Sequence, residues 1–186
     1  YLVGKIERVN GFAMNFIKQR RLPSAEVSGL ADAAGSEEMG EVTVEDAMAI
    51  LARMEGGVMA TFEATRFATG RRNHNCVEVN GSKGSIWWDL ERMDELHFYT
   101  DEDPKFARGF RTILVTEPEH PYLPNYWPAG HIIGWAETFA NEIYDFLKSI
   151  EDDTMPSPSF RDGLQNQKVL DAVIKSSETE QWVDVE

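Results

Sequence analysis

Two short turns that contain glycine connect strand-like segments of the chain and restrict how those segments can pair. They are Glu55-Gly56-Gly57 and Gly81-Ser82-Lys83-Gly84. Glycine permits the positive φ angles that tight hairpin turns require. Strands joined by such short turns must be antiparallel neighbours. The sequence therefore predicts an antiparallel sheet, with strands at residues 5–16, 46–54, 58–69, 76–80, 85–90, 96–99 and 111–116.

The strand predicted at residues 58–69 is apolar on both of its faces. Side chains alternate between the two faces of a strand, so Val58 and Phe62 share one face, while Met59 and Phe67 share the other. A sheet that is apolar on both sides needs cover on both sides. We therefore expect other parts of the protein to pack against each face.

Two helices are predicted near the end of the chain, at residues 131–150 and 160–177, because apolar residues recur there at spacings of three and four. Ser159-Phe160-Arg161-Asp162 resembles a capping box with Asp in place of the usual Glu. Trp182, Val183 and Val185 predict a closing strand. The expected fold is α+β, an open, mostly antiparallel sheet of about six to eight strands with two helices packed on one face.

Residues 1–186 are expected to form a single substrate-binding and oligomerisation domain. The other apolar face would remain exposed in a monomer, and large exposed apolar patches mark interaction sites. We predict a homo-oligomer through this open sheet face, docking on a missing domain, or both.

Two long connections interrupt the series of strands. Residues 18–41 are rich in Ala, Gly, Ser and Glu, so we predict a mobile surface loop there. Residues 116–130 contain four prolines together with Tyr122, Tyr126 and Trp127. This second connection is expected to be stiff and aromatic.

The composition excludes several kinds of partner. The formal net charge of -14 argues against nucleic acid and anionic membrane surfaces, both of which attract basic proteins. No apolar segment approaches the ~20 residues of a membrane span. The single cysteine, Cys76, cannot form an internal disulfide, which predicts a reducing, cytoplasmic location. We expect Cys76 to be buried and structural.

Several catalytic motifs are absent from the sequence. There is no G-x-G-x-x-G dinucleotide fingerprint, no phosphate-binding P-loop and no G-x-S-x-G nucleophile elbow. Gly81-Ser82-Lys83-Gly84 lies between two strands, so it offers no helix dipole to a phosphate. The four histidines have no metal-motif spacing. We therefore predict no cofactor-binding, catalytic or metal-binding residues in this chain.

His131 is the best single candidate for contact with a substrate. It is expected at the start of a helix, where a neutral imidazole is favoured and can bond a hydroxyl. Trp127 and Tyr126 precede it and offer flat apolar surfaces for a sugar ring. In the alternative interpretation, His131 caps the helix and the aromatic residues pack on the core.

Arg66 is the second candidate, because it interrupts an apolar strand face. It would bind a carboxylate, a phosphate or a polar substrate. The alternative is a structural salt bridge at a domain interface.

The order of several segments resembles the C-terminal domain of the Gfo/Idh/MocA oxidoreductases over nearly the whole chain. The matching segments are Val42–Ala47, Glu55–Val58, Glu63–Arg66, Val77–Ser85, Gly134–Glu142 and Pro158–Ser177. The resemblance implies a two-domain NAD(P)-dependent enzyme that acts on sugars, polyols or related compounds. It also implies a C-terminal domain that lines the substrate site and mediates oligomerisation.

The family's catalytic residues have no counterpart in this chain. In the family, a Lys in an E-K-P motif and an Asp and a His four residues apart act on the substrate, and an N-terminal Rossmann domain binds the cofactor. This sequence contains neither motif. We therefore expect that it begins, at Tyr1, just after the last catalytic residue, and that it is inactive alone.

Two other functions remain possible on the sequence alone. One is a stand-alone sugar-binding or protein-interaction module without redox chemistry. The other is a hydrolase that uses scattered Asp and Glu residues, although no paired-carboxylate motif supports it. The residues that precede Tyr1 would distinguish the dehydrogenase from the stand-alone module.

Overall fold

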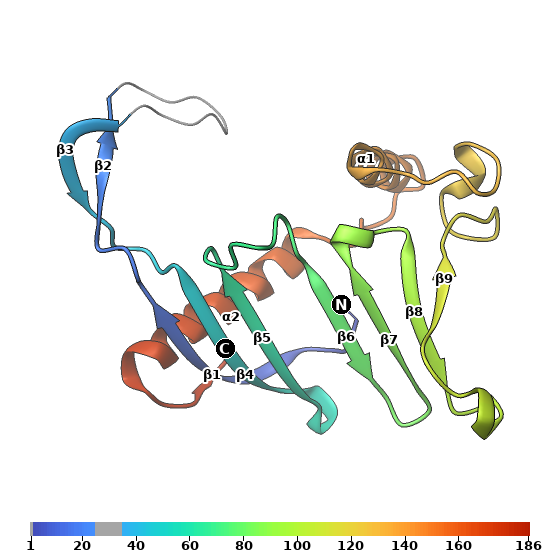
Figure 1. The fold of residues 1–186 in the computed structure, drawn as a ribbon, viewed down its shortest axis with the longest axis horizontal. Coiled ribbons are helices and arrows are strands. Elements are labelled where there is room, and N and C mark those ends of the chain that lie inside the picture. The colour runs from blue at the N-terminus through green and yellow to red at the C-terminus, as the bar shows by residue number, and fades with distance from the viewer. Residues whose placement is uncertain (1, 25–34) are drawn as a thin grey trace. The chain divides into compact units, whose positions relative to one another are not determined.

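The computed structural model in Figure 1 describes residues 2–24 and 35–186. Two compact units divide the chain, Tyr1–Thr69 with Pro158–Glu186, and Gly70–Ser157. Tyr1 itself lies outside the described residues. Among the residues described, no helix is both long and apolar enough to cross a membrane.

The first unit contains a four-stranded antiparallel sheet in the order β10-β1-β4-β5. Its strands are β1 (Ile6–Met14), β4 (Ala47–Met54), β5 (Met59–Thr65) and β10 (Val183–Asp184). The predicted glycine turn is confirmed as the short 3-10 helix η1 (Glu55–Gly57), in which Gly56 and Gly57 have φ angles of 73° and 80°. The predicted closing strand is also confirmed, because β10 pairs with β1.

Helix α2 (Phe160–Thr179) packs against β1 and β10. The core between helix and sheet consists of Val9, Ala52, Ala172 and Val173, which are all buried. Helix and strand approach closely at Gly11, where an added Cβ would lie 2.8 Å from Val173 Cγ1. The absence of a side chain at Gly11 therefore allows α2 to approach the sheet this closely.

The predicted capping box at the start of α2 is confirmed. Ser159 Oγ accepts a hydrogen bond from the Arg161 backbone N–H, and Asp162 Oδ2 accepts one of 2.7 Å from the Ser159 backbone N–H. These bonds satisfy N–H groups that have no partner within the helix. The Ser159 N–H, followed by the Ser159 hydroxyl, lowers the pKa of Asp162 below its usual value.

The sheet face opposite α2 carries exposed apolar side chains. The strand register places Phe12, Leu51 and Met59 on this side, and Met59 is 79% exposed. The sequence predicted apolar residues on both faces of these strands, and the structure agrees.

The prediction of a surface loop at residues 18–41 is wrong for the residues that the structure describes. Strands β2 (Gln19–Pro23) and β3 (Gly35–Glu41) form an antiparallel hairpin, and the residues between them lie outside the description. In Figure 1 this hairpin extends beyond the sheet of β1, β4 and β5. Its composition of Gly, Glu, Arg and Pro has low strand propensity, so cross-strand pairing determines its conformation.

The second unit contains its own four-stranded antiparallel sheet, in the order β6-β7-β8-β9. Its strands are β6 (Cys76–Asn80), β7 (Gly84–Asp89), β8 (Glu95–Thr100) and β9 (Arg111–Leu114). The predicted turn between β6 and β7 is confirmed by a 2.9 Å hydrogen bond from Gly81 N to Gly84 O. The strands thus form two four-stranded sheets and a hairpin rather than one hydrogen-bonded sheet.

The two faces of the second sheet differ in polarity. The register aligns Val77, Trp88, Leu96 and Ile113 across one face. It aligns Glu78, Trp87, His97 and Thr112 across the other. One face is therefore apolar and the other mixes aromatic with polar side chains.

Helix α1 (Trp135–Glu151) completes the second unit, together with the short 3-10 helices η2 (Leu90–Arg92), η3 (Lys105–Ala107) and η4 (Leu123–Asn125). The prediction that this helix begins at His131 is wrong, because its N-cap is Gly134. The Glu137 carboxylate accepts a 2.9 Å hydrogen bond from the Gly134 N–H and so caps the helix there. With two helices and open antiparallel sheets, the predicted α+β class is confirmed.

Candidate functional site

The connection at residues 116–130 folds into an ordered segment around a buried leucine. Leu123 begins η4 and is buried, and the Tyr126 N–H donates to its carbonyl oxygen at 3.0 Å. The Gly130 N–H donates to the carbonyl oxygen of buried Thr116 at 3.4 Å, which brings the two ends of the segment together. The aromatic residues of this segment are therefore held on a defined support.

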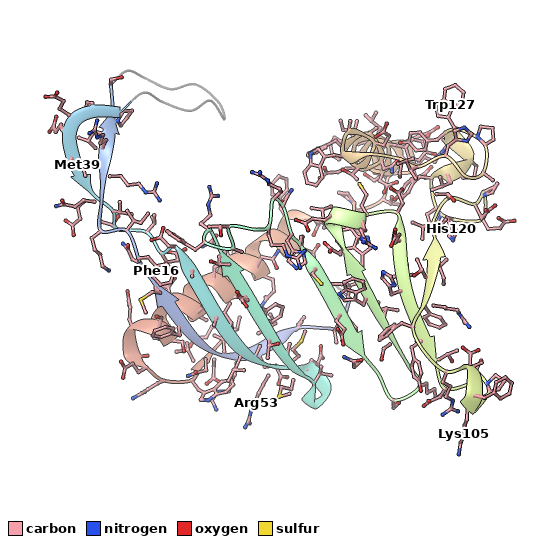
Figure 2. The ribbon with its side chains drawn as sticks, in the orientation of Figure 1. Phe16, Met39, Arg53, Lys105, His120 and Trp127 are labelled. Atoms are coloured by element: carbon pink, nitrogen blue, oxygen red, sulfur yellow. The ribbon has the colours of Figure 1, made fainter. Side chains whose placement is uncertain are left out.

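Trp127 and His131 lie beside each other on the surface of this segment. Their ring centroids are 6.0 Å apart, with 32° between the ring planes. The two residues line an open surface pocket together with Gly130 and Ile132. The Trp127 indole is 73% exposed and projects from the end of the segment, as Figure 2 shows.

The tautomer of His131 follows from its hydrogen bond. Its Nδ1 lies 2.7 Å from the carbonyl oxygen of Pro128. A carbonyl oxygen can only accept, so Nδ1 carries the hydrogen and donates it. In the neutral ring, Nε2 then has a free lone pair that can accept a hydrogen bond from a hydroxyl group. His131 lies before the helix, so the helix-capping alternative does not describe it.

Tyr126 does not join this aromatic pair. Its hydroxyl donates to Asn141 Oδ1 on α1 at 2.6 Å, and its side chain is half-buried. Nearby, the Tyr122 hydroxyl donates to Asp145 Oδ2 on the same helix at 2.5 Å. The two tyrosines fasten the segment to α1, and the packing alternative fits Tyr126 best.

Arg66 belongs to the first unit, where it follows β5. Its backbone N–H donates to the carbonyl oxygen of Asp46 at 2.8 Å, while its side chain is exposed. Its guanidinium forms no ion pair with any residue that the structure describes. The salt-bridge alternative therefore has no partner for Arg66 within the described parts of the chain.

A cluster of ionisable side chains that the sequence does not predict lies at the end of β7. His74 Nδ1 lies 3.1 Å from Asp89 Oδ1 and 3.9 Å from Glu91 Oε2. Imidazole and carboxylates of this kind can hold a divalent cation. However, Glu91 Oε2 already accepts a 2.9 Å hydrogen bond from Arg71, and Glu91 Oε1 accepts one from the Arg72 N–H. We interpret the cluster as a clamp that holds residues 71–74 against η2.

The pKa values of both carboxylates in this clamp reflect their hydrogen bonds. The Glu91 backbone N–H lowers the pKa of Asp89, with a further contribution from His74. The Arg72 N–H and then the Arg71 side chain lower the pKa of Glu91. The only signal in the sequence was the spacing of Asp89 and Glu91 after a strand, which is too common to identify a site.

Cys76 is exposed, so the prediction that it is buried is wrong. It lies at the start of β6, on the polar face of the second sheet, where Trp87 Nε1 donates to its sulfur at 2.9 Å. On the same face the rings of Trp87 and His97 are 4.4 Å apart. Alternation placed Cys76 in a strand but did not show which face would be covered.

A second cavity of about 220 Å³ lies beside β8, between apolar side chains that include Met93, Val115 and Leu123. Its polar groups, Asp94 and His120, already accept hydrogen bonds from the backbone N–H groups of Ile133 and Glu117. Figure 2 labels His120 at this position. The polar atoms are therefore engaged in holding the surrounding segments, which makes this a weaker candidate than the pocket at Trp127 and His131.

Comparison with known proteins extends over nearly the whole chain. The model of the oxidoreductase family, C-terminal alpha/beta domain, matches residues 17–185. Levoglucosan dehydrogenase of Pseudarthrobacter phenanthrenivorans is 40% identical over 187 residues, which cover 100% of this chain and 48% of that protein.

Solved structures give the same result. An oxidoreductase domain protein from Kribbella flavida is 47% identical, with a TM-score of 0.88, over 97% of this chain and 46% of that one. Levoglucosan dehydrogenase in complex with NADH and levoglucosan is 38% identical, with a TM-score of 0.87, over 100% of this chain and 46% of that one. The chain thus spans about half the length of these relatives. It belongs to the Gfo/Idh/MocA oxidoreductases and corresponds to their C-terminal alpha/beta domain.

Proposed function

We propose that residues 1–186 form the substrate-binding and oligomerisation domain of an NAD(P)-dependent dehydrogenase that acts on a sugar, a polyol or a related compound. The similarity to levoglucosan dehydrogenase over the full length of the chain is the observation that carries this proposal. The relatives contain about as many further residues again. The chain would form the walls of the substrate site, and the catalytic groups and cofactor would lie in the other half of such a protein.

Trp127 and His131 are the substrate-contacting residues in this proposal. A pyranose ring has an apolar face formed by its C–H groups, which can stack on an exposed indole. The hydroxyl groups at the edge of the ring can donate to His131 Nε2, because Nδ1 is occupied by Pro128. Tyr126 supports the segment from beneath through Asn141. Arg66, which belongs to the first unit, is proposed independently of this pair as a residue that binds a polar group, because its charge is unpaired among the described residues.

NAD or NADP is the cofactor implied for the whole enzyme. The similar levoglucosan dehydrogenase has been solved with NADH bound, which favours NAD. The sequence contains no dinucleotide fingerprint, so no residue of this chain is assigned to the cofactor. The cytoplasmic location stays a prediction.

The proposal that the catalytic groups lie outside this chain can be tested with the isolated chain. Mixed with NAD or NADP and a panel of anhydrosugars, aldoses and polyols, it is expected to give no change in absorbance at about 340 nm, because it lacks the proton-transfer lysine that the family resemblance implies. Turnover by this chain alone would contradict the proposal.

The substrate site is tested in a protein that joins this chain to the N-terminal half of levoglucosan dehydrogenase. Trp127→Ala and His131→Ala are each expected to raise KM for the sugar by roughly tenfold, because each removes one direct contact. Trp127→Phe should retain part of the stacking. Phe106→Ala is the matched control, since Phe106 is also an exposed aromatic residue of the second unit, 94% exposed. Equal effects of Trp127→Ala and Phe106→Ala would contradict the assignment, and sugar binding without any turnover would favour the stand-alone binding module.

Association through the open sheet faces is the other half of the proposal. Phe12, Leu51 and Met59 make the exposed face of the first sheet apolar, and such a surface favours association. The chain is expected to sediment as a dimer or a larger assembly at micromolar concentration. A strictly monomeric mass would contradict this part of the proposal.

A further inference from the structure

The pocket at Trp127 and His131 presents a hydrogen-bond acceptor to a ligand, because the donors nearest to it are already engaged. The His131 ring donates from Nδ1 to the carbonyl oxygen of Pro128 at 2.7 Å. The His131 backbone N–H donates to the same oxygen at 3.3 Å, and the Gly130 N–H donates to the carbonyl oxygen of Thr116 at 3.4 Å. In the neutral ring, Nε2 keeps a lone pair that can accept a hydrogen bond.

The chain beyond the pocket uses its N–H groups in the same way. The Ile133 N–H, which follows the pocket residue Ile132, donates to Asp94 Oδ1 at 3.3 Å. The Gly134 N–H donates to Glu137 Oε2 at 2.9 Å. The start of a helix can bind an anion through its N–H groups. At α1, the Glu137 carboxylate already occupies that place.

Positively charged side chains are absent from this part of the sequence. Residues 112–147 contain no Lys or Arg, whereas they contain five carboxylate residues, Glu117, Glu119, Glu137, Glu142 and Asp145. None of these five carboxylates forms an ion pair within the part of the chain that the structure describes. The potential around this segment is therefore negative.

Glu117 lies closest to the pocket along the backbone. It directly follows Thr116, whose carbonyl oxygen accepts the hydrogen bond from Gly130. The Glu117 N–H donates to His120 Nδ1 at 3.0 Å, which fixes the chain at this point. Charges within about 8–10 Å of each other still interact at physiological salt. The exposed Glu117 carboxylate therefore acts on a ligand in the pocket.

We infer that this pocket takes an uncharged sugar or polyol and rejects one that carries a phosphate or a carboxylate group. The inference rests on the proposed contact of Trp127 and His131 with a sugar, and it concerns the second unit alone, whereas Arg66 belongs to the first. A hydroxyl group can donate to His131 Nε2, but the oxygens of an ionised group can only accept. Such a group meets a lone pair at Nε2, a neighbouring carboxylate and no cation.

The two causes of this selectivity respond differently to salt. Sites that bind phosphate supply charge-assisted hydrogen bonds from Arg, Lys or a helix start, and the lack of such donors does not depend on salt. Repulsion by Glu117 is screened as the salt concentration rises. The preference for uncharged ligands should therefore decrease in high salt but not disappear.

Binding to the full chain of 186 residues tests the inference. Ligand-observed NMR would compare glucose, mannose and inositol, each with its own monophosphate, at low and at high salt. The uncharged member of a pair is expected to bind roughly tenfold more tightly at low salt. His131→Arg places a cation in the pocket and should reverse this preference. Glu117→Gln should strengthen binding of the monophosphates several-fold.

Glu102→Gln is the matched control for Glu117→Gln, because it removes an exposed carboxylate from the same unit. It should leave every affinity unchanged, and circular dichroism would establish that each variant is folded. Monophosphates that bind the wild type as tightly as the parent sugars would overturn the selectivity but leave the sugar contact intact. If no sugar binds, the contact and the selectivity both fail. Folded His131→Arg and Glu117→Gln proteins that gain no affinity for monophosphates would also overturn the inference.

Discussion

The backbone N–H of Gly11 on β1 donates a 3.0 Å hydrogen bond to the hydroxyl oxygen of Ser176 on α2, across 165 residues of sequence. The same hydroxyl donates to the carbonyl oxygen of Gln181, and Ser176 is fully buried. Two residues further along β1, the Ala13 N–H donates a 2.9 Å hydrogen bond to Ser177 Oγ on α2. Among the described residues, β10 pairs with β1 only at Arg8 and Val9. Beyond that point, serine hydroxyls of α2 accept the hydrogen bonds of the β1 backbone N–H groups in place of a neighbouring strand.

Ser176→Ala is expected to destabilise the first unit by about 2 kcal/mol, because it leaves the N–H of buried Gly11 and the carbonyl oxygen of Gln181 without their partner. Chemical denaturation would measure the difference in unfolding free energy. Thr179→Ala is the control, since Thr179 is an exposed hydroxyl residue on the same helix. An equal loss of unfolding free energy in both variants would show that the hydrogen bond between Gly11 and Ser176 does not stabilise the first unit.

Gly11→Ala should destabilise the same unit by about 1–3 kcal/mol, because overpacking forces side chains and backbone to move. The added Cβ would lie 2.8 Å from Val173 Cγ1 and 2.9 Å from the Val173 carbonyl oxygen. Val173→Ala would remove only the first of these contacts, so the double variant should recover little of the loss.

Gly70→Ala is the matched control for Gly11→Ala. Nothing lies within 4 Å of a Cβ at Gly70, and its φ is not in the left-handed region. Thermal unfolding should separate the two variants clearly. A Gly11→Ala protein as stable as Gly70→Ala would mean that α2 can shift away from β1 without penalty.

Asp162 makes the stability of α2 depend on acid. The Ser159 N–H lowers the pKa of Asp162 in the folded protein from the usual 3.8. The contribution of Asp162 to the free energy of unfolding is therefore complete above pH 3.8 and is lost as the pH falls through the pKa of the folded protein. Asp162→Asn should therefore flatten the decline in stability between about pH 6 and about pH 3. Urea denaturation at the two pH values would measure the change.

The control for the acid response is Glu178→Gln, which removes an exposed carboxylate from the same helix. It should leave the decline unchanged. If Asp162→Asn behaves like Glu178→Gln, the capping box does not contribute to acid sensitivity.

The clamp at the end of β7 is expected to protect residues 71–74 from proteolysis. Asp89→Ala removes the acceptor for both His74 and the Glu91 N–H, so trypsin should cut after Arg71 or Arg72 several-fold faster. Mass spectrometry of the fragments would locate the cut. Glu102→Ala, an exposed carboxylate of the same unit, should not accelerate it, and equal rates in both variants would contradict the clamp.

The sequence predicted those parts of the fold whose cause is local. Glycines at Gly56, Gly57 and Gly81 identified the hairpin turns, and three- and four-residue spacing identified both helices. Ser159 and Asp162 identified a helix start because capping involves residues close in sequence. These features needed no knowledge of the tertiary structure.

Features that depend on distant residues could not be predicted in this way. The hairpin of β2 and β3 has weak strand propensity. The chain leading into it is fixed by the hydrogen bond from the Phe16 N–H to the carboxylate of Asp46, 30 residues away in the sequence. His74 contacts Asp89 only because β6 pairs with β7 in a hairpin, which brings the start of β6 beside the end of β7. The start of α1 is set by the cap at Gly134 and not by the helix's apolar residues, so the predicted start at His131 was too early.

The candidate site was partly predictable for the same reason. Trp127 and His131 are four residues apart, and a compact proline-rich segment brings them together. Tyr126 shares that segment, but its hydroxyl has a partner on α1 that periodicity alone does not reveal.

The first unit is assembled from both ends of the chain, because α2 and β10 pack against β1. During synthesis, β1 leaves the ribosome long before residues 158–186 are made, and it must wait for its partner helix. Residues 70–157 are contiguous and can fold first. The order of translation therefore places the completion of the first unit at α2, and a chain whose synthesis stops before Phe160 would have the sheet of the second unit formed and that of the first uncovered.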